Sequence, residues 1–318
     1  MKTKIYLLII AVLFLSTWMV NNGWSQNEPV NGYYDSVNDW FVFEWERPNY
    51  GKTMTIYDPP HKVKPLINAE LIFDEKNREY KYAYEVTNQV GAKQHLEGIL
   101  IKHLTEIYAA TSPEPSAYWS MGEYRDKSAW EWAKVGGEGE GILPNDTERG
   151  FSFKSTGLPI IVNVGFYGHE RAIYSPPGDY DTDEVEDSFE RVMKNLEKQY
   201  PEKFKYVVKR TLGPTAPPAD FKPIEFITNI INIKHEASAL GWITNKGIEQ
   251  SLDAKLDNAK KKIEQGNIGA AKNILSAFIN EVEAQGCAVY ENCPQGKHLT
   301  PEAYALLKYN VQYLIGKL

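Results

Sequence analysis

The 318-residue sequence lacks the short motifs that mark the best-known hydrolases and nucleotide-binding proteins. There is no Gly-x-Ser-x-Gly turn to expose a nucleophilic serine. The dipeptide His169-Glu170 has no second histidine four residues later, which a zinc-protease helix requires. The glycine-rich stretch 136–141 carries acids where a phosphate-binding loop needs a lysine. These absences exclude the serine hydrolases, zinc proteases and nucleotide hydrolases that depend on those motifs.

Positive charge is also in short supply. Lys and Arg number 35 against 42 Asp and Glu, so the formal net charge is −7, and it becomes −9 if Lys2 and Lys4 are removed with a leader. No run of more than three basic residues is present, and an acidic chain without a larger basic cluster is not expected to bind nucleic acid.

Long apolar runs are scarce after the N-terminus. Lys2 and Lys4 precede an apolar stretch at residues 5–15, and Gly23 and Ser25 are small residues at the −3 and −1 positions of a cleavage site before Gln26. This pattern predicts a secretory signal peptide over residues 1–25. The alternative is an uncleaved anchor, but the 16 residues 5–20 fall short of the ~20 that a spanning helix prefers. We therefore expect a secreted, periplasmic or cell-surface protein whose mature chain has no transmembrane segment.

Cysteine is limited to two residues, Cys287 and Cys293. In an exported chain a close pair of this kind predicts a disulfide. Because the loop that it closes is short, chain-entropy arguments assign it only ~2 kcal/mol. The alternative is a metal site that includes His298, but two thiols and one histidine are an incomplete ligand set for structural zinc.

The last hundred residues show a clear helical period. Apolar residues recur at steps of three and four in four sets, which places each set on one stripe of a helix; the sets centre on Ile230, Leu256, Leu275 and Leu307. Helix boundaries are marked by Pro223, Gly241, Gly266-Asn267 and Thr300-Pro301. Four striped helices with short connections bury their stripes against one another, so residues 223–318 are predicted to form a four-helix bundle.

The same region resembles the FIMAH-type helical module. The resemblance rests on the residues Ala239-Leu-Gly-Trp-Ile243, on Leu252, Leu256, Ala259, Gly266, Ala271, Leu275, Phe278 and Val282, and on Leu299-Thr300 with Ala305 to Leu307. Such modules stand at the C-terminus of many secreted bacterial proteins, and binding to a cell surface or polysaccharide is suspected for them. The resemblance implies a fold and a setting, and it supplies no ligand residues.

Residues 26–212 change to a period of two and are predicted to form an antiparallel β-sandwich. In the clearest strand, Tyr80, Tyr82, Tyr84 and Val86 share one face. The stretch from Ile142 to Pro159, together with Tyr80 to Asn88, resembles immunoglobulin-like domains of uncharacterised secreted bacterial proteins. A helix is expected over residues 184–199, and the proline-rich residues 213–222 are expected to be a semi-stiff linker that makes the two domains separable.

Two groups of residues in the β-rich region are candidate sites. Trp119, Trp130 and Trp132 could stack on sugar rings if exposed, although aromatic residues also fill sandwich cores. The second group has the spacing of calcium-loop ligands and consists of Asp179, Asp181, Asp183 and Glu190. However, Glu184 stands where that loop needs glycine, so an acidic first turn of a helix is the alternative to a Ca²⁺ site.

The sequence thus predicts an α+β multi-domain protein, with an N-terminal β-sandwich followed by a four-helix bundle. We expect an exported, non-catalytic protein that binds a polysaccharide or another envelope component. The alternatives are a secreted glycoside-type hydrolase with its acids in the β domain, and a purely structural envelope protein. An exposed aromatic strip would favour binding, and a cleft with two converging carboxylates would favour the enzyme.

Overall fold

The computed structural model describes residues 28–47, 50–114, 118–124, 128–135, 141–168, 171–172, 177, 181–291 and 293–318. The predicted signal peptide lies outside these residues. The chain divides into two compact units, of which the first comprises residues 1–58 and 170–202 and the second comprises residues 59–169 and 203–318. The predicted region 26–212 is therefore shared between two units, and the predicted helical bundle belongs to the same unit as most of the β-rich region.

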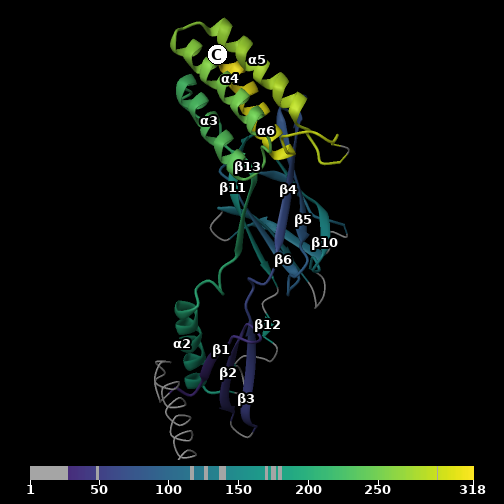
Figure 1. Cartoon of the computed structure of the whole chain (residues 1–318). Helices are drawn as coiled ribbons and strands as arrows, with labels where there is room; N and C mark the ends of the chain where they lie inside the picture. The colour runs from purple at the N-terminus through teal and green to yellow at the C-terminus, as the bar shows by residue number, and fades with distance from the viewer. Residues whose placement is uncertain are drawn as a thin grey trace, which may run out of the picture. The chain divides into compact units, whose positions relative to one another are not determined.

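The first unit combines a small antiparallel sheet with one helix (Figure 1). The sheet has the order β1-β2-β3-β12, formed by Asn31–Asp35, Trp40–Arg47, Gly51–Asp58 and Arg171–Ala172. Helix α2, Asp183–Gln199, packs on the sheet with Phe189 against Phe43 at a ring distance of 4.6 Å. Its start was predicted within one residue, and Thr182 caps it by accepting a hydrogen bond from the Val185 amide.

The second unit contains two antiparallel sheets packed face to face. One sheet has the order β4-β5-β10-β7, formed by Pro65–Asp74, Glu79–Asn88, Asp146–Ser155 and Tyr108–Thr111. The other has the order β13-β11-β6-β9-β8, formed by Val207–Thr215, Leu158–Gly168, Leu96–Lys102, Ala129–Lys134 and Trp119–Glu123. The antiparallel sandwich predicted from the period of two is thus confirmed, with its strands placed close to the predicted positions.

Aromatic residues fill the space between these sheets. Tyr82 and Tyr84 project inward from β5, and their hydroxyls donate to the backbone oxygens of Gly157 and Leu212 at 2.9 Å. Burial raises the pKa of both phenols well above its usual value, so they remain protonated donors. Buried tyrosines of this kind combine a large apolar surface with a satisfied hydroxyl, which explains their abundance in β5.

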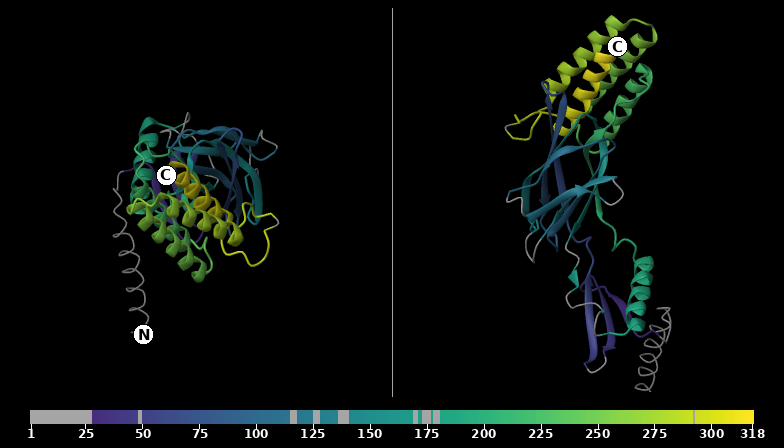
Figure 2. Two further views of the ribbon diagram at one scale, coloured as in Figure 1. Left: turned by 90° about the horizontal axis from the view of Figure 1, so that it is seen from above. Right: turned by 180° about the vertical axis from the view of Figure 1, so that it is seen from behind.

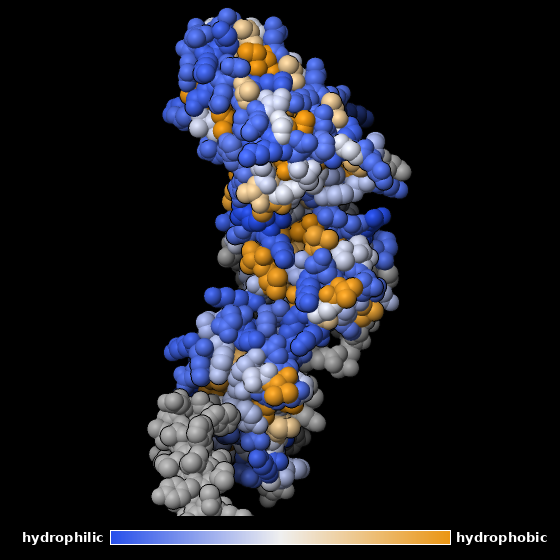
Figure 3. All heavy atoms as spheres, in the orientation of Figure 1, coloured by the Kyte–Doolittle hydropathy of each residue, from blue (hydrophilic) through white to orange (hydrophobic). Residues whose placement is uncertain are grey.

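Four helices follow the sandwich in sequence: α3, Pro223–Ala239; α4, Lys246–Glu264; α5, Ile268–Gln285; and α6, Pro301–Lys317. Each contacts its two neighbours in a closed ring of four. Gly266, with φ of 70°, ends α4, and the side chain of Asn267 caps α5, as predicted from their sequence. The visible face of this helical group is mostly hydrophilic (Figure 3), in keeping with one apolar stripe per helix.

Helix α6 is an exception, because nearly every residue of its first half is buried. It lies against the sandwich while it packs on α3 and α5 (Figure 2), and it contacts both β4 and β11. The amide of Asn310 donates to the Pro159 oxygen at 2.9 Å. The apolar core consequently runs from the sandwich into the helices without interruption. Of the predicted linker, Gly213 to Thr215 are the last residues of β13.

Candidate functional site

The outer face of the sheet β4-β5-β10 carries a row of polar side chains. Asn68 and Arg149 both lie opposite Glu85 in the strand register, and alternation along each strand turns all three away from the core. The Asn68 amide donates to one Glu85 oxygen at 3.0 Å, and Arg149 forms an ion pair with the other. The sheet thus presents an amide, a carboxylate and a guanidinium in line.

A loop between α5 and α6 forms a wall beside this row. The disulfide Cys287–Cys293, with 5.8 Å between the Cα atoms, closes the loop and confirms the predicted pairing. Within it, the Tyr290 amide donates to Glu70 of β4 at 2.6 Å, and the Tyr290 hydroxyl donates to Glu302 of α6 at 2.6 Å. Both ends of Tyr290 are therefore fixed, while the residue remains 37% exposed.

Glu302 ties the loop, the helix and the sheet together. It stands in the first turn of α6, is only 2% exposed, and accepts a hydrogen bond from the Ala69 amide of β4 at 2.7 Å. Burial raises the pKa of its carboxyl above the usual value, and the hydrogen bonds from Ala69 and Tyr290 oppose that rise. Burial and the nearby Glu302 in turn raise the pKa of the Tyr290 phenol, which keeps it a donor.

The row of polar side chains and the disulfide loop form the two sides of an open groove of about 210 Å³. Its lining contains Asn68, Glu70, Ala83, Tyr84, Glu85, Arg149, Gly150, Val289, Tyr290 and Glu291. Three carboxylates face one guanidinium, so the groove has an excess of two negative charges. A partly exposed aromatic ring beside hydrogen-bonding carboxylate and amide groups can hold a polar, hydroxyl-bearing molecule, whereas the negative excess disfavours an anion. A second pocket, of about 230 Å³, is lined mainly by apolar residues of β11 and α3.

Two of the three candidate tryptophans are buried, and the third packs against the core. Trp132 is completely buried and Trp119 is 5% exposed, while Trp130 is half-buried against the core. Trp132 donates to the Thr111 oxygen at 2.8 Å, and Trp119 donates to Glu148 at 3.1 Å. The prediction that these three rings form an exposed stacking site is therefore corrected, because they belong to the core of the sandwich and its edge. Trp130 and Trp132 do share a strand face, but that face is the inner one.

The described acids of the predicted calcium loop do not come together either. Asp179 lies outside the described residues. Asp181 accepts hydrogen bonds from Trp45 and Arg47 at 2.8 and 2.6 Å, so it serves the packing of the first unit. Asp183 and Glu190 are exposed residues of α2 separated by seven positions, about 10 Å along a helix axis, which is too far for one ion. The calcium prediction is therefore corrected. The alternative interpretation holds for Asp183, which belongs to the acidic first turn of α2.

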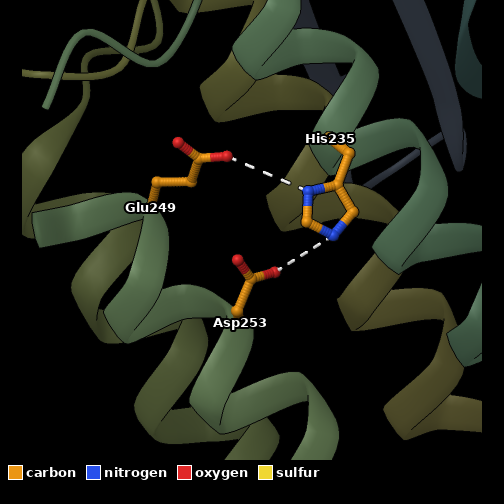
Figure 4. A group of neighbouring side chains, drawn as sticks. All are labelled: His235, Glu249 and Asp253. Carbon is orange, nitrogen blue, oxygen red and sulfur yellow. Dashed lines mark ion pairs between the residues drawn. The ribbon is translucent and has the colours of Figure 1, made fainter. Parts of the chain in front are cut away.

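A further polar group joins helices α3 and α4. His235 of α3 lies between Glu249 and Asp253 of α4, and these are the residues, within the described part of the chain, that could together hold a metal ion (Figure 4). The neighbouring Lys234 is fully buried and pairs with both carboxylates. Hydrogen bonding from Ser238, followed by the charge of Lys234, lowers the pKa of Glu249. The sequence analysis missed this group. The signal that could have revealed it is a pair of acids, Glu249 and Asp253, four residues apart on one predicted helix.

Comparison with known proteins finds a similarity in the helical region. The family model described as the FIMAH domain matches residues 233–316, which confirms the resemblance predicted for the C-terminal region. No curated protein matches the chain. Among solved structures, an uncharacterised protein from Nocardia farcinica, described as having an immunoglobulin-like fold, is 14% identical over 49% of this chain and 98% of that chain, with a TM-score of 0.24.

Two observations bear on the compartment. Cys287 and Cys293 form a disulfide, which fits a protein that matures in an oxidising environment. Within the described residues, none of the helices has the length and apolar character needed to cross a membrane.

Proposed function

We propose that this chain is an exported, non-catalytic binding protein, and that the groove between the sheet β4-β5-β10 and the disulfide loop holds a neutral, hydroxyl-rich glycan of the cell envelope. One observation carries the proposal: Tyr290 is partly exposed, yet its amide and hydroxyl are both bonded within the protein. An aromatic side chain that is fixed before binding loses little entropy when a ligand packs against it.

The neighbouring polar groups support a glycan as the ligand. Sugar hydroxyls both donate and accept, so Glu85 can accept from a hydroxyl while Asn68 and Arg149 can donate to one. The volume of about 210 Å³ leaves room for one sugar ring at a time. Because carboxylates predominate, polymers rich in uronic acid or phosphate are disfavoured.

The carboxylates of the groove argue for binding in preference to hydrolysis. A hydrolase of the two-carboxylate type needs one acid that is free to give up a proton to the leaving group. Two of the three groove carboxylates are already engaged: Glu85 accepts from Asn68 and pairs with Arg149, and Glu70 accepts the Tyr290 amide, which leaves Glu291 as a single further acid where the reaction needs a pair. Glu70 and Glu85 therefore serve as fixed acceptors, which suits recognition.

The experiment is a binding assay with the mature, disulfide-bonded protein and a panel of neutral and uronic-acid-containing oligosaccharides. Asn68→Ala should weaken binding of a neutral oligosaccharide by about five- to tenfold, which corresponds to one lost hydrogen bond. The matched control is Lys81→Ala, which changes an exposed residue on the outer face of β5 away from the groove lining. Equal binding by Asn68→Ala and wild type would reject the groove, and release of shorter sugars would favour the hydrolase.

A further inference from the structure

The polar group on the helices has the geometry of a chelating site. Glu249 and Asp253 are four residues apart, so they project from one face of α4 toward α3. The imidazole of His235 lies between them, with Nε2 3.6 Å from the Asp253 Oδ1 atom and Nδ1 3.9 Å from the Glu249 Oε1 atom (Figure 4). All three ligand atoms lie within 4.8 Å of one another. Asp253 faces Nε2 and Glu249 faces Nδ1, so an ion bound at Nε2 would lie beside Asp253 and would reach Glu249 after that side chain turns.

Lys234 pairs with both carboxylates, and it contacts Asp253 through Oδ2, the oxygen that does not face His235. Its ammonium is fully buried and lies 2.7 Å from the Asp253 Oδ2 atom and 3.4 Å from Glu249. The other oxygen of Asp253, Oδ1, is buried and accepts no hydrogen bond from the described residues. A buried acceptor without a donor is costly, and this one faces the imidazole side of the group. Lys234 therefore orients Asp253 and leaves Oδ1 for a second cation.

We propose that His235, Glu249 and Asp253 form a binding site for a divalent transition-metal ion, of which Zn²⁺ fits best. Ligands of tetrahedral zinc lie about 3.4 Å apart, close to the present separation of Nε2 and Oδ1. Glu249 completes the set by a rotation of its side chain. A mixed nitrogen and oxygen set suits zinc better than calcium or magnesium, which prefer oxygen ligands alone.

Charge and access agree with a cation of this type. Two carboxylates and one ammonium leave one negative charge, and the imidazole supplies a nitrogen ligand when it binds the ion in its unprotonated form. The His235 side chain is 54% exposed, so an ion can enter from solvent and keep water in its fourth position. The ion would link α3 to α4 within the FIMAH match. This site is independent of the proposed glycan groove, because the two share no residue.

The test is calorimetric titration of tag-free, chelator-treated protein with ZnCl₂ alone and, in parallel, with CaCl₂ alone. Wild type should bind one Zn²⁺ and no Ca²⁺, and His235→Ala should weaken Zn²⁺ binding by about tenfold or more. His298→Ala removes a histidine of the same helical region outside the group and should bind as wild type does. Since His235 is half-exposed, its removal leaves the Lys234 ion pairs in place, and circular dichroism verifies the fold.

Glu249→Gln provides a second variant that should also weaken binding. Absorption of the Co²⁺-substituted protein should report a tetrahedral site in wild type and lose that signature in His235→Ala. Absence of Zn²⁺ binding by wild type, equal binding by His235→Ala, or an equal loss in His298→Ala would each overturn the assignment. Binding of Ca²⁺ as tightly as Zn²⁺ would overturn the choice of ion.

Discussion

Glu302 is the residue on which the geometry of the groove wall depends, and replacing it with leucine tests that dependence. Leucine fills similar space but accepts no hydrogen bond, so the Ala69 amide and the Tyr290 hydroxyl each lose the bond to this side chain. An orphaned buried amide costs about 1–3 kcal/mol, and an ordinary hydrogen bond contributes about 1 kcal/mol. We expect Glu302→Leu to lower the free energy of unfolding by about 2–4 kcal/mol.

The conservative variant Glu302→Gln separates hydrogen bonding from charge. Its amide oxygen can still accept from Ala69, and its NH₂ group can donate to the Tyr290 oxygen, so the loss of stability should be smaller than for leucine. Since burial raises the pKa of Glu302 in the folded protein, the folded state binds more protons than the unfolded state above the ordinary carboxyl value. The stability that the protonated Glu302 carboxyl contributes is therefore fully present below about pH 4, and it is lost as the pH rises through the raised pKa of the folded protein.

The assay is denaturant unfolding followed by circular dichroism, for wild type and both variants, at mildly acidic and at neutral pH. Wild type should lose its advantage over Glu302→Gln as the pH rises. A Glu302→Leu protein within about 0.5 kcal/mol of wild type, the range of an ordinary surface change, would refute the network. A pH trend of the opposite sign would refute the account of the buried carboxyl.

Three further predictions concern stability. Trp132→Ala should lower the free energy of unfolding in denaturant by about 3–5 kcal/mol, as for a truncated core aromatic. The control is Tyr50→Ala, at an exposed position, and no loss of stability in Trp132→Ala would contradict the burial of this ring. Reduction of Cys287–Cys293 should lower stability by only ~2 kcal/mol but weaken ligand binding in the groove, and unchanged binding after reduction would mean that the loop is not a wall of the site. Residues 223–318 expressed alone should melt at a lower temperature than the same helices in the full chain, because α6 loses its contacts with β4 and β11; a calorimetric midpoint equal to that of the full chain would show that these contacts are dispensable.

The sequence predicted those features that local chemistry decides. The cap residues Asn267 and Thr300 and the glycine after α4 marked helix ends that the structure confirms. Strand β5 was visible because its tyrosines occupy every second position from residue 80 to 84, with Lys81, Ala83 and Glu85 on the other face. The cysteine pair was predicted from compartment and spacing. Each of these signals is contained within a few neighbouring residues.

Features that depend on long-range pairing were missed. A period of two shows that Trp130 and Trp132 share a face, but it does not show which face is inner. The groove combines Asn68, Arg149 and Tyr290, which only the strand register and the helix packing bring together. The dense apolar residues of α6 on more than one side were the available sign that this helix also packs on the sandwich.

The central claim, that the groove beside Tyr290 binds a neutral glycan, is tested most directly by mapping amide chemical shifts during titration of the isotope-labelled, disulfide-bonded protein with a neutral oligosaccharide from the binding panel. The account predicts that the largest shifts occur at Asn68, Glu85, Arg149 and Tyr290, and that they grow in parallel to saturation. Saturable shifts centred on any other surface, or none with any oligosaccharide of the panel, would contradict it.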